Sequence, residues 1–173
     1  EDTALAMMEQ IQGSSLPIVL DADAINILST HRNWLSRLPK RCILTPHLGE
    51  LERLIGKCMD TYERLTKVKE LAAYLQSYII VKGAWTAIVT PEGNFHFNPT
   101  GNPGMATGGS GDVLTGILLG LLTQGYPQED ACRLGVYIHG LAGDIAAEAK
   151  TEIGMTANDI IEALPVAWKK IAS

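Results

Sequence analysis

The sequence predicts an α/β fold, in which helices cover both faces of a mostly parallel sheet and a small β-hairpin is added. Short apolar runs typical of buried strands alternate along the chain with longer segments whose apolar residues recur at helical spacing. Such strand–helix–strand connections place successive strands parallel, with helices over both faces. The period changes between residues 86 and 97, where two strand-like runs flank Pro91-Glu92-Gly93 and indicate a hairpin.

Each expected element rests on a local pattern. The run Pro17–Asp21 is apolar and ends on a carboxylate, which is typical of a buried parallel strand. The helix expected over 111–124 is apolar on nearly every side, so it should lie in the interior. The other expected elements are strands over 42–45, 78–82, 86–90 and 94–97, and helices over 2–12, 23–29, 46–55, 62–76, 129–149 and 157–171.

The chain has 173 residues, which fits a single domain over 1–173. It opens with a helix, and only about five strands are visible, whereas a doubly wound sheet usually has more. We therefore expect that N-terminal strands of the domain are missing and that this chain is its C-terminal portion.

Composition argues against several classes of function. The formal net charge is -5 and lysine and arginine form no cluster, so nucleic-acid binding is not expected. Three widely spaced cysteines without a Cys-x-x-Cys pair favour neither a zinc site nor a disulfide framework, and they suit a cytoplasmic setting. The longest apolar run, 117–122, is too short to cross a membrane, and the acidic first residues do not resemble a targeting signal.

The most informative segment is the glycine-rich stretch from Thr100 to Asp112, which runs directly into the apolar helix. Glycines let the backbone approach a phosphate closely, and the first N–H groups of a helix point at such an anion with the helix dipole behind them. The pattern is neither a Walker P-loop nor a dinucleotide fingerprint, because no Lys-Ser/Thr follows its last glycine and no strand directly precedes it. We expect an anion hole formed by Gly108, Gly109, Ser110 and Gly111.

Asp112 stands at the start of the same helix. A carboxylate beside a bound phosphate is unfavourable unless it has a purpose, and a general base that takes a proton from an attacking hydroxyl has one. The alternative is that Asp112 only caps the helix and favours its dipole. His139 lies in the middle of a helix and is interpreted as structural.

Three further polar clusters follow expected strands. The first cluster is the segment 82–86, which begins with a lysine. The second is His47 with Glu50, which can share one face at the start of a helix. The third is Asp21 with Asp23, at the end of the first strand. Glu50 could hold a magnesium ion through water, since that ion prefers oxygen ligands. Taken singly, each cluster has a structural alternative: a strand-end lysine in solvent, a helix-terminal charge, or an N-cap. Because parallel strands end at one edge of a sheet, we expect these three clusters and the glycine-rich helix start to converge there.

Five motifs, in their order along the chain, resemble the ADP-dependent NAD(P)H-hydrate dehydratase family. The resemblance extends from about Leu20 to the end of the chain, and the glycine-rich motif is its most specific part. The motifs are Leu20-Asp21-Ala22-Asp23-Ala24, Thr45-Pro46-His47-Leu48-Gly49-Glu50, Val81-Lys82-Gly83-Ala84-Trp85-Thr86, Ala106-Thr107-Gly108-Gly109-Ser110-Gly111-Asp112 and His139-Gly140-Leu141-Ala142-Gly143-Asp144.

The resemblance implies a ribokinase-like fold and a hydro-lyase that repairs NADH or NADPH hydrated at C6 of the nicotinamide ring. In that reaction ADP phosphorylates the C6 hydroxyl of the S-epimer, phosphate leaves, and NAD(P)H and AMP are formed. The resemblance also implies a need for magnesium, a cytoplasmic homotetramer and, in many members, a fused epimerase domain upstream. Nucleic acid and membranes are not among the implied partners.

The resemblance also assigns individual residues. Asp112 matches an aspartate that contacts the substrate and acts as the base, Gly111 matches a glycine that contacts AMP, and His47 matches a histidine that binds the hydrate. Trp85 and Leu48 stand where smaller residues or proline are usual, and two small residues of the family's hydrate site have no counterpart in this chain. The AMP-binding segment corresponds to Lys82, Gly83, Ala84, Trp85 and Thr86.

Two other interpretations stay open. A small-molecule kinase of the same fold, acting for example on a hydroxymethylpyrimidine or a sugar, would use the same glycine loop and base but would release a phosphorylated product. A non-catalytic nucleotide-binding module would bind ADP or AMP without turnover.

Overall fold

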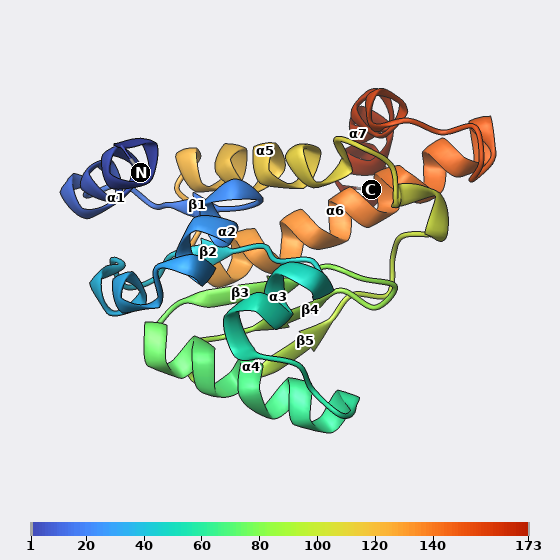
Figure 1. Ribbon diagram of the computed structural model, residues 1–173. Coiled ribbons are helices and arrows are strands. Elements are labelled where there is room, and N and C mark those ends of the chain that lie inside the picture. The colour runs from blue at the N-terminus through green and yellow to red at the C-terminus, as the bar shows by residue number, and fades with distance from the viewer. Residues whose placement is uncertain (1, 173) are drawn as a thin grey trace. The chain divides into compact units, whose positions relative to one another are not determined.

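A computed structural model describes residues 2–172 (Figure 1). The described chain divides into two compact units. The first comprises the chain up to Gly83 together with Ala87–His96, and the second comprises Ala84–Thr86 together with the chain from Phe97 onward. The single domain expected over 1–173 stays a prediction.

The first unit is built around a sheet whose strand order is β1-β2-β3-β4-β5. β1 and β2 pair in parallel, as do β2 and β3, whereas β4 is antiparallel to β3. The predicted parallel sheet is therefore confirmed for β1 to β3, and the direction changes between β3 and β4. β4 and β5, the two strands of the predicted hairpin, are neighbours in the sheet. Its elements are α1 (Asp2–Gly13), β1 (Val19–Leu20), α2 (Asp23–Thr30), the 3-10 helix η1 (Arg32–Arg37), β2 (Ile43–Leu44), α3 (Leu48–Ile55), α4 (Thr61–Leu75), β3 (Tyr78–Val81), β4 (Ala87–Val89) and β5 (Phe95–Phe97), whose last residue belongs to the second unit.

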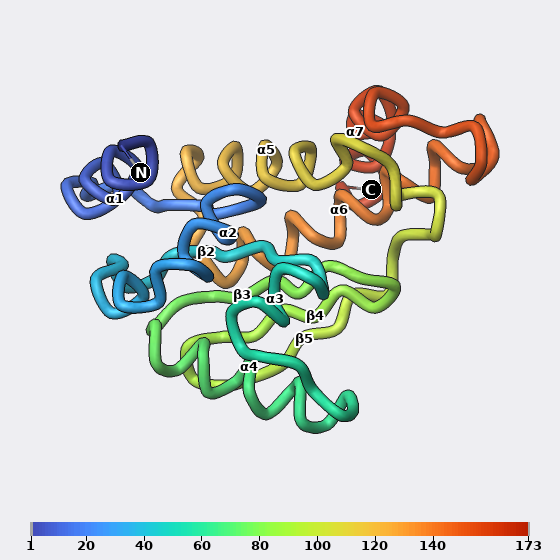
Figure 2. Tube along the Cα trace, viewed as in Figure 1, coloured from blue at the N-terminus to red at the C-terminus, as the bar shows by residue number. Residues whose placement is uncertain are grey.

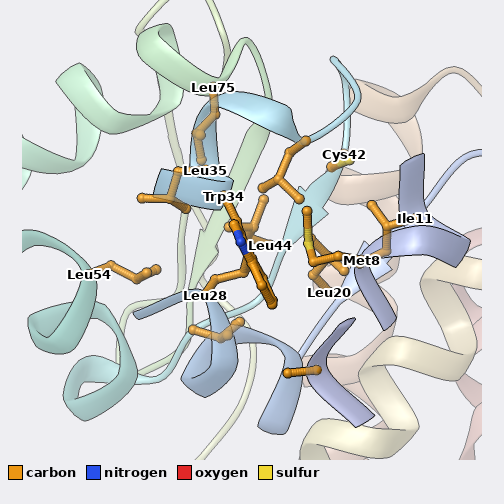
Figure 3. Packing of buried hydrophobic residues seen from close by; sticks show 13 residues of the cluster. Met8, Ile11, Leu20, Leu28, Trp34, Leu35, Cys42, Leu44, Leu54 and Leu75 are labelled. Atoms are coloured by element: carbon orange, nitrogen blue, oxygen red, sulfur yellow. The ribbon is translucent and has the colours of Figure 1, made fainter. Parts of the chain in front are cut away.

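Two hydrophobic clusters hold this unit together. One gathers side chains from α1, α2 and η1 around the ends of β1 and β2, with Met8, Leu28 and Trp34 among its members (Figure 3). The other packs Leu51 of α3 and Val68 of α4 against one face of β3 and β4. Helix periodicity in the sequence therefore corresponds to real buried stripes, because the apolar faces of α3 and α4 are the faces that cover the sheet.

The 3-10 helix η1 is not expected from the sequence. It places Trp34 and Leu35 in the first cluster, and the Trp34 ring stacks on His31 with ring centroids 4.2 Å apart. A single short helix of this kind has no repeating apolar pattern, so periodicity cannot reveal it.

The second unit is helical. Its elements are η2 (Pro103–Met105), α5 (Ser110–Thr123), α6 (Gln128–Lys150) and α7 (Ala157–Ala172). The chain leaves α6 through a turn and returns as α7, and α6 packs against both α5 and α7 (Figure 2). Their shared core includes Val113 of α5, Ile138 and Ala142 of α6, and Ile160 of α7.

The prediction that α5 would be interior on all sides is only partly right. Val113, Leu114 and Leu118 are buried, but Gly116 is exposed and Leu119 is 49% exposed. Gly116 and Gly120 line a groove between α5 and α7, so α7 does not cover this face of α5.

Two further features concern the helices and the cysteines of the described residues. None of their helices is long and apolar enough to span a membrane. All three cysteines are free thiols, and burial raises the pKa of the Cys42 thiol to about 11. A thiol with so high a pKa is mostly protonated at neutral pH and is a poor nucleophile.

Leu28→Ala tests the packing of the first cluster. Leu28 is fully buried, so its truncation should lower the free energy of unfolding by about 2–5 kcal/mol. Leu5→Ala on α1, where the side chain is 49% exposed, is the matched control and should change that energy by less than about 0.5 kcal/mol. Denaturant unfolding of the intact protein measures both values. Equal losses of unfolding free energy in the two variants would contradict the burial of Leu28 in this cluster.

Candidate active site

Polar side chains meet at the carboxyl ends of β1, β2 and β3 in the first unit. The pairing of β2 and β3 continues past both strands, because His47 forms a parallel bridge with Lys82, whose N–H donates to the carbonyl of Pro46 at 2.9 Å. Lys82 Nζ donates to Oδ1 of Asp21, which follows β1, at 2.7 Å. The predicted convergence is therefore present for Asp21, His47 and Lys82, which share one edge of the sheet. The glycine-rich helix start belongs to the second unit, and its part in the convergence stays a prediction.

The Asp21–Lys82 ion pair is largely shielded from water. The Asp21 side chain is 10% exposed and the Lys82 side chain 22%. Burial alone would raise the pKa of Asp21, but the hydrogen bond and charge of Lys82, with further hydrogen bonds from Ala22 and Thr45, outweigh burial and leave that pKa below its usual value. Asp21 thus stays ionised at neutral pH and fixes the Lys82 ammonium group at the sheet edge.

His47 and Glu50 form a capping box at the start of α3. Nδ1 of His47 accepts from the N–H groups of Gly49 at 3.0 Å and Glu50 at 3.3 Å, while Oε2 of Glu50 accepts from the N–H of His47 at 2.9 Å. Nδ1 must be unprotonated to accept these bonds, so a neutral ring carries its proton on Nε2. The His47 side chain is 54% exposed. The ring is therefore partly open to solvent, and the capping box fixes its orientation.

Glu50 is less available than the sequence suggests. Its side chain is 6% exposed, with Oε2 held by the cap and Oε1 lying 3.4 Å from Nε2 of His47. Within residues 2–172 there is no group of three or more His, Cys, Asp or Glu side chains arranged to hold a metal. Magnesium commonly takes only one or two protein carboxylates, with phosphate oxygens and water completing its shell. The described residues could therefore hold magnesium only in this way, with few protein ligands. The role of Glu50 as a ligand through water stays a prediction.

In the second unit, the glycine-rich loop ends in a helix N-terminus that no described side chain caps. Gly109 is the N-cap residue of α5 and adopts φ 88°, a left-handed conformation that favours glycine. Space lies open in front of Gly108, where an added Cβ would meet nothing within 4 Å. The first N–H groups of a helix have no partner within the helix and carry the positive end of its dipole. The N–H of Ser110 donates to the carbonyl of Thr107 at 3.3 Å. The role of Gly108, Gly109, Ser110 and Gly111 as an anion hole stays a prediction.

Asp112 lies in the first turn of α5 and is exposed. Asp112 is not the N-cap residue of α5, because Gly109 holds that position, but its charge in the first turn favours the helix dipole, so this part of the structural alternative stays open. Asp112 lines a groove of about 630 Å³ between α5 and α7. Of the groove-lining side chains that the structure describes, Asp112 is the charged one, and the others include Ile161 and Trp168. No pattern in the sequence indicates this groove.

The segment predicted to bind AMP crosses from one unit to the other. Lys82 and Gly83 belong to the first unit, and Ala84, Trp85 and Thr86 belong to the second. Trp85 is 73% exposed, which leaves its ring accessible to a ligand, and the carbonyl of Thr86 accepts from the N–H of Asn98 at 2.9 Å. The nucleotide-binding role of these five residues stays a prediction.

Comparison with known proteins settles which family this arrangement belongs to. The family model described as NAD(P)H-hydrate dehydratase matches residues 1–166. The chain belongs to the NAD(P)H-hydrate dehydratase family. It is 39% identical to the bifunctional NAD(P)H-hydrate repair enzyme Nnr of Thermofilum pendens, over 99% of this chain and 33% of that protein. It is 42% identical to the ADP-dependent (S)-NAD(P)H-hydrate dehydratase of Neisseria meningitidis, over 85% of this chain and 51% of that protein.

Solved structures confirm the ribokinase-like fold of this dehydratase-family chain. An ADP/ATP-dependent NAD(P)H-hydrate dehydratase from Bacillus subtilis, co-crystallised with ATP and Mg²⁺, matches with a TM-score of 0.82 at 32% identity, covering 98% of this chain and 60% of that one. A ribokinase-like superfamily protein from Enterococcus faecalis matches equally well, with a TM-score of 0.82 at 33% identity over 98% of this chain and 59% of that one. The chain thus spans about a third to three fifths of the length of these relatives.

Asp21→Asn tests the electrostatics of the sheet edge. The pKa of Asp21 is lower in the folded protein than in the unfolded chain, so the ionised carboxylate stabilises the fold. This stabilisation is complete above about pH 3.9, the pKa of an unfolded aspartate, and is lost as the pH falls through the folded pKa. The unfolding free energy lost on substitution should therefore be largest near neutral pH and shrink below about pH 4. Denaturant unfolding across this pH range measures it. A loss that grows on acidification would contradict the assignment.

Proposed function

We propose that the protein containing this chain converts (S)-NAD(P)H-hydrate to NAD(P)H in a reaction that consumes ADP and releases AMP and phosphate. One observation carries the proposal: the uncapped N-terminus of α5 offers N–H groups to a phosphate, and the carboxylate of Asp112 stands exposed in the same turn. Membership of the dehydratase family and the named activities of its relatives support this choice of substrate and nucleotide.

The proposed chemistry needs one proton acceptor and one phosphate site. Asp112 takes the proton of the C6 hydroxyl, whose oxygen then attacks the β-phosphorus of ADP and displaces AMP. The N–H groups of the α5 N-terminus balance the charge on the transferred phosphoryl group. The C6–O bond of the phosphorylated hydrate then breaks, phosphate leaves, and a ring proton is lost as the double bond reforms.

The remaining residues receive supporting roles in this proposal. Lys82, with Gly83, Ala84, Trp85 and Thr86, binds the nucleotide, and the Nε2–H of His47 donates to the hydrate. Magnesium supplies positive charge to the nucleotide phosphates, and Glu50 is the residue that would reach it through water. A cytoplasmic location, a homotetramer and a fused epimerase domain belong to the same proposal, and the bifunctional names of several relatives support the last of these.

Asp112→Asn is the direct test of the base. In the intact protein it should lower the rate of hydrate dehydration by about two to four orders of magnitude, the usual contribution of a general base. Affinity for ADP should change little, because the N–H groups remain. The absorbance of reduced nicotinamide, followed with hydrated NADH, ADP and magnesium, measures the rate.

Asp130→Asn is the matched control for that substitution. Asp130 is also an exposed aspartate in the first turn of a helix, in this case α6, so removal of its charge should leave the rate near that of the wild type. Near-normal turnover by Asp112→Asn would remove Asp112 from the mechanism.

Lys82→Ala should weaken ADP binding by about ten- to a hundredfold, the range that corresponds to one hydrogen bond to a charged group. Titration calorimetry measures the dissociation constant. Lys67→Ala is the control, since it also removes a lysine paired with a carboxylate, that of Glu63, but on the exposed side of α4. Unchanged affinity in Lys82→Ala would exclude this lysine from the nucleotide site.

A further inference from the structure

One face of α6 holds the beginning of the glycine-rich segment. Oδ2 of Asp144 accepts from the N–H of Gly101 at 2.9 Å, and Oδ1 accepts from Nδ2 of Asn102 at 3.0 Å. Asn102 in turn accepts, through its Oδ1, from the N–H of Gly104 at 3.0 Å and so caps η2. Both oxygens of Asp144 are thus used to fix the path of residues 101–104.

The backbones of α6 and this segment lie in close contact. Gly140 and Gly143 lie four and one residues before Asp144, and an added Cβ would collide with Thr100 at the first position and with Met105 at the second. The hydroxyl of Thr100 also donates to the carbonyl of Tyr137 at 2.9 Å. The two glycines therefore let the segment approach α6 closely enough for Asp144 to reach it.

The other end of the segment is tied to the same helix. Oγ of Ser110, the first residue of α5, lies 3.3 Å from Nε2 of His139 on α6, and the Ser110 side chain is buried. Residues 100–110 are thus attached to α6 at both ends, by Asp144 and by His139. In the sequence, the motif 139–144 stands out only through the family resemblance, and no role in the site is predicted for these side chains.

We propose that Asp144 is a positioning residue for the anion hole: it fixes the course of the glycine-rich segment and, through it, the N–H groups at the start of α5 that receive the transferred phosphoryl group. The inference rests on the proposed function. Asp144 acts through the backbone, so its loss should be felt in the transition state, where small misplacements of binding groups reduce rates by up to about a hundredfold.

A reciprocal exchange of side chains tests this role. Both side-chain oxygens of Asp144 accept hydrogen bonds, and Asp144→Asn leaves only one oxygen to do so. Asn102→Asp places a second carboxylate next to that of Asp144, so the two negative charges repel each other. In the double variant Asp144→Asn/Asn102→Asp, the carboxylate introduced at position 102 can accept from the Gly104 N–H and from the amide introduced at position 144. The carbonyl of that amide can accept from the Gly101 N–H, so all three hydrogen bonds are restored.

Steady-state kinetics of the intact protein give the first readout. Each single variant should lower kcat for hydrate dehydration about ten- to a hundredfold and change KM for ADP and hydrate much less, because the interaction matters in the transition state. The double variant should recover most of the lost kcat. Asp60→Asn, which alters a carboxylate that caps α4 in the first unit, controls for a general loss of stability and should keep kcat.

Amide hydrogen exchange gives a second readout that needs no turnover. The Gly101 amide should exchange faster in both single variants and return towards the wild-type rate in the double variant. Single variants with wild-type kcat, or a double variant no better than either single one, would overturn the proposal, as would unchanged exchange at Gly101. Absence of dehydration by the wild-type protein would reject the proposed function, and the exchange pattern would still decide whether Asp144 fixes the segment.

Discussion

The proposed chemistry depends on a helix N-terminus whose N–H groups no described side chain caps. Gly109 in a left-handed conformation starts α5, and the glycine before it leaves the approach open. Such an end is stabilised by an anion. Asp112 in the first turn also favours the dipole, but its charge repels a bound phosphate. In the proposed reaction, Asp112 loses this charge when it takes the proton of the attacking hydroxyl, so the repulsion falls as the phosphoryl group arrives. An aspartate at this position therefore suits the role of a base better than the role of a phosphate-binding residue.

In both units, the groups proposed to meet ligands are held by polar neighbours from other elements. In the first unit, Asp21 orients Lys82 and the capping box orients His47. In the second, Asp144 and His139 of α6 hold the two ends of the glycine-rich segment. Side chains and N–H groups held in this way lose little freedom when a ligand binds, which is the condition for effective electrostatic stabilisation of a transition state.

Much of the fold could be predicted from the sequence because the decisive signals are local. Continuous apolar runs marked β1 to β3, Pro91-Glu92-Gly93 marked the hairpin, and the glycines before Asp112 marked the start of α5. The features that were missed depend on contacts between residues far apart in the sequence, or on a residue type that is rare at its structural position. Asp144 lies 42 residues from its partner Asn102, so their hydrogen bond leaves no local pattern in the sequence. Histidine is an uncommon N-cap residue, so the role of His47 at the start of α3 leaves none either.

The stoichiometry of products from the wild-type protein tests the central claim most directly. With hydrated NADH, ADP and magnesium, each ADP consumed should yield one AMP, one phosphate and one NADH, measured together by chromatography and by the absorbance of the reduced ring. Accumulation of a stable phosphorylated substrate, or binding of ADP with no product of any kind, would contradict the account.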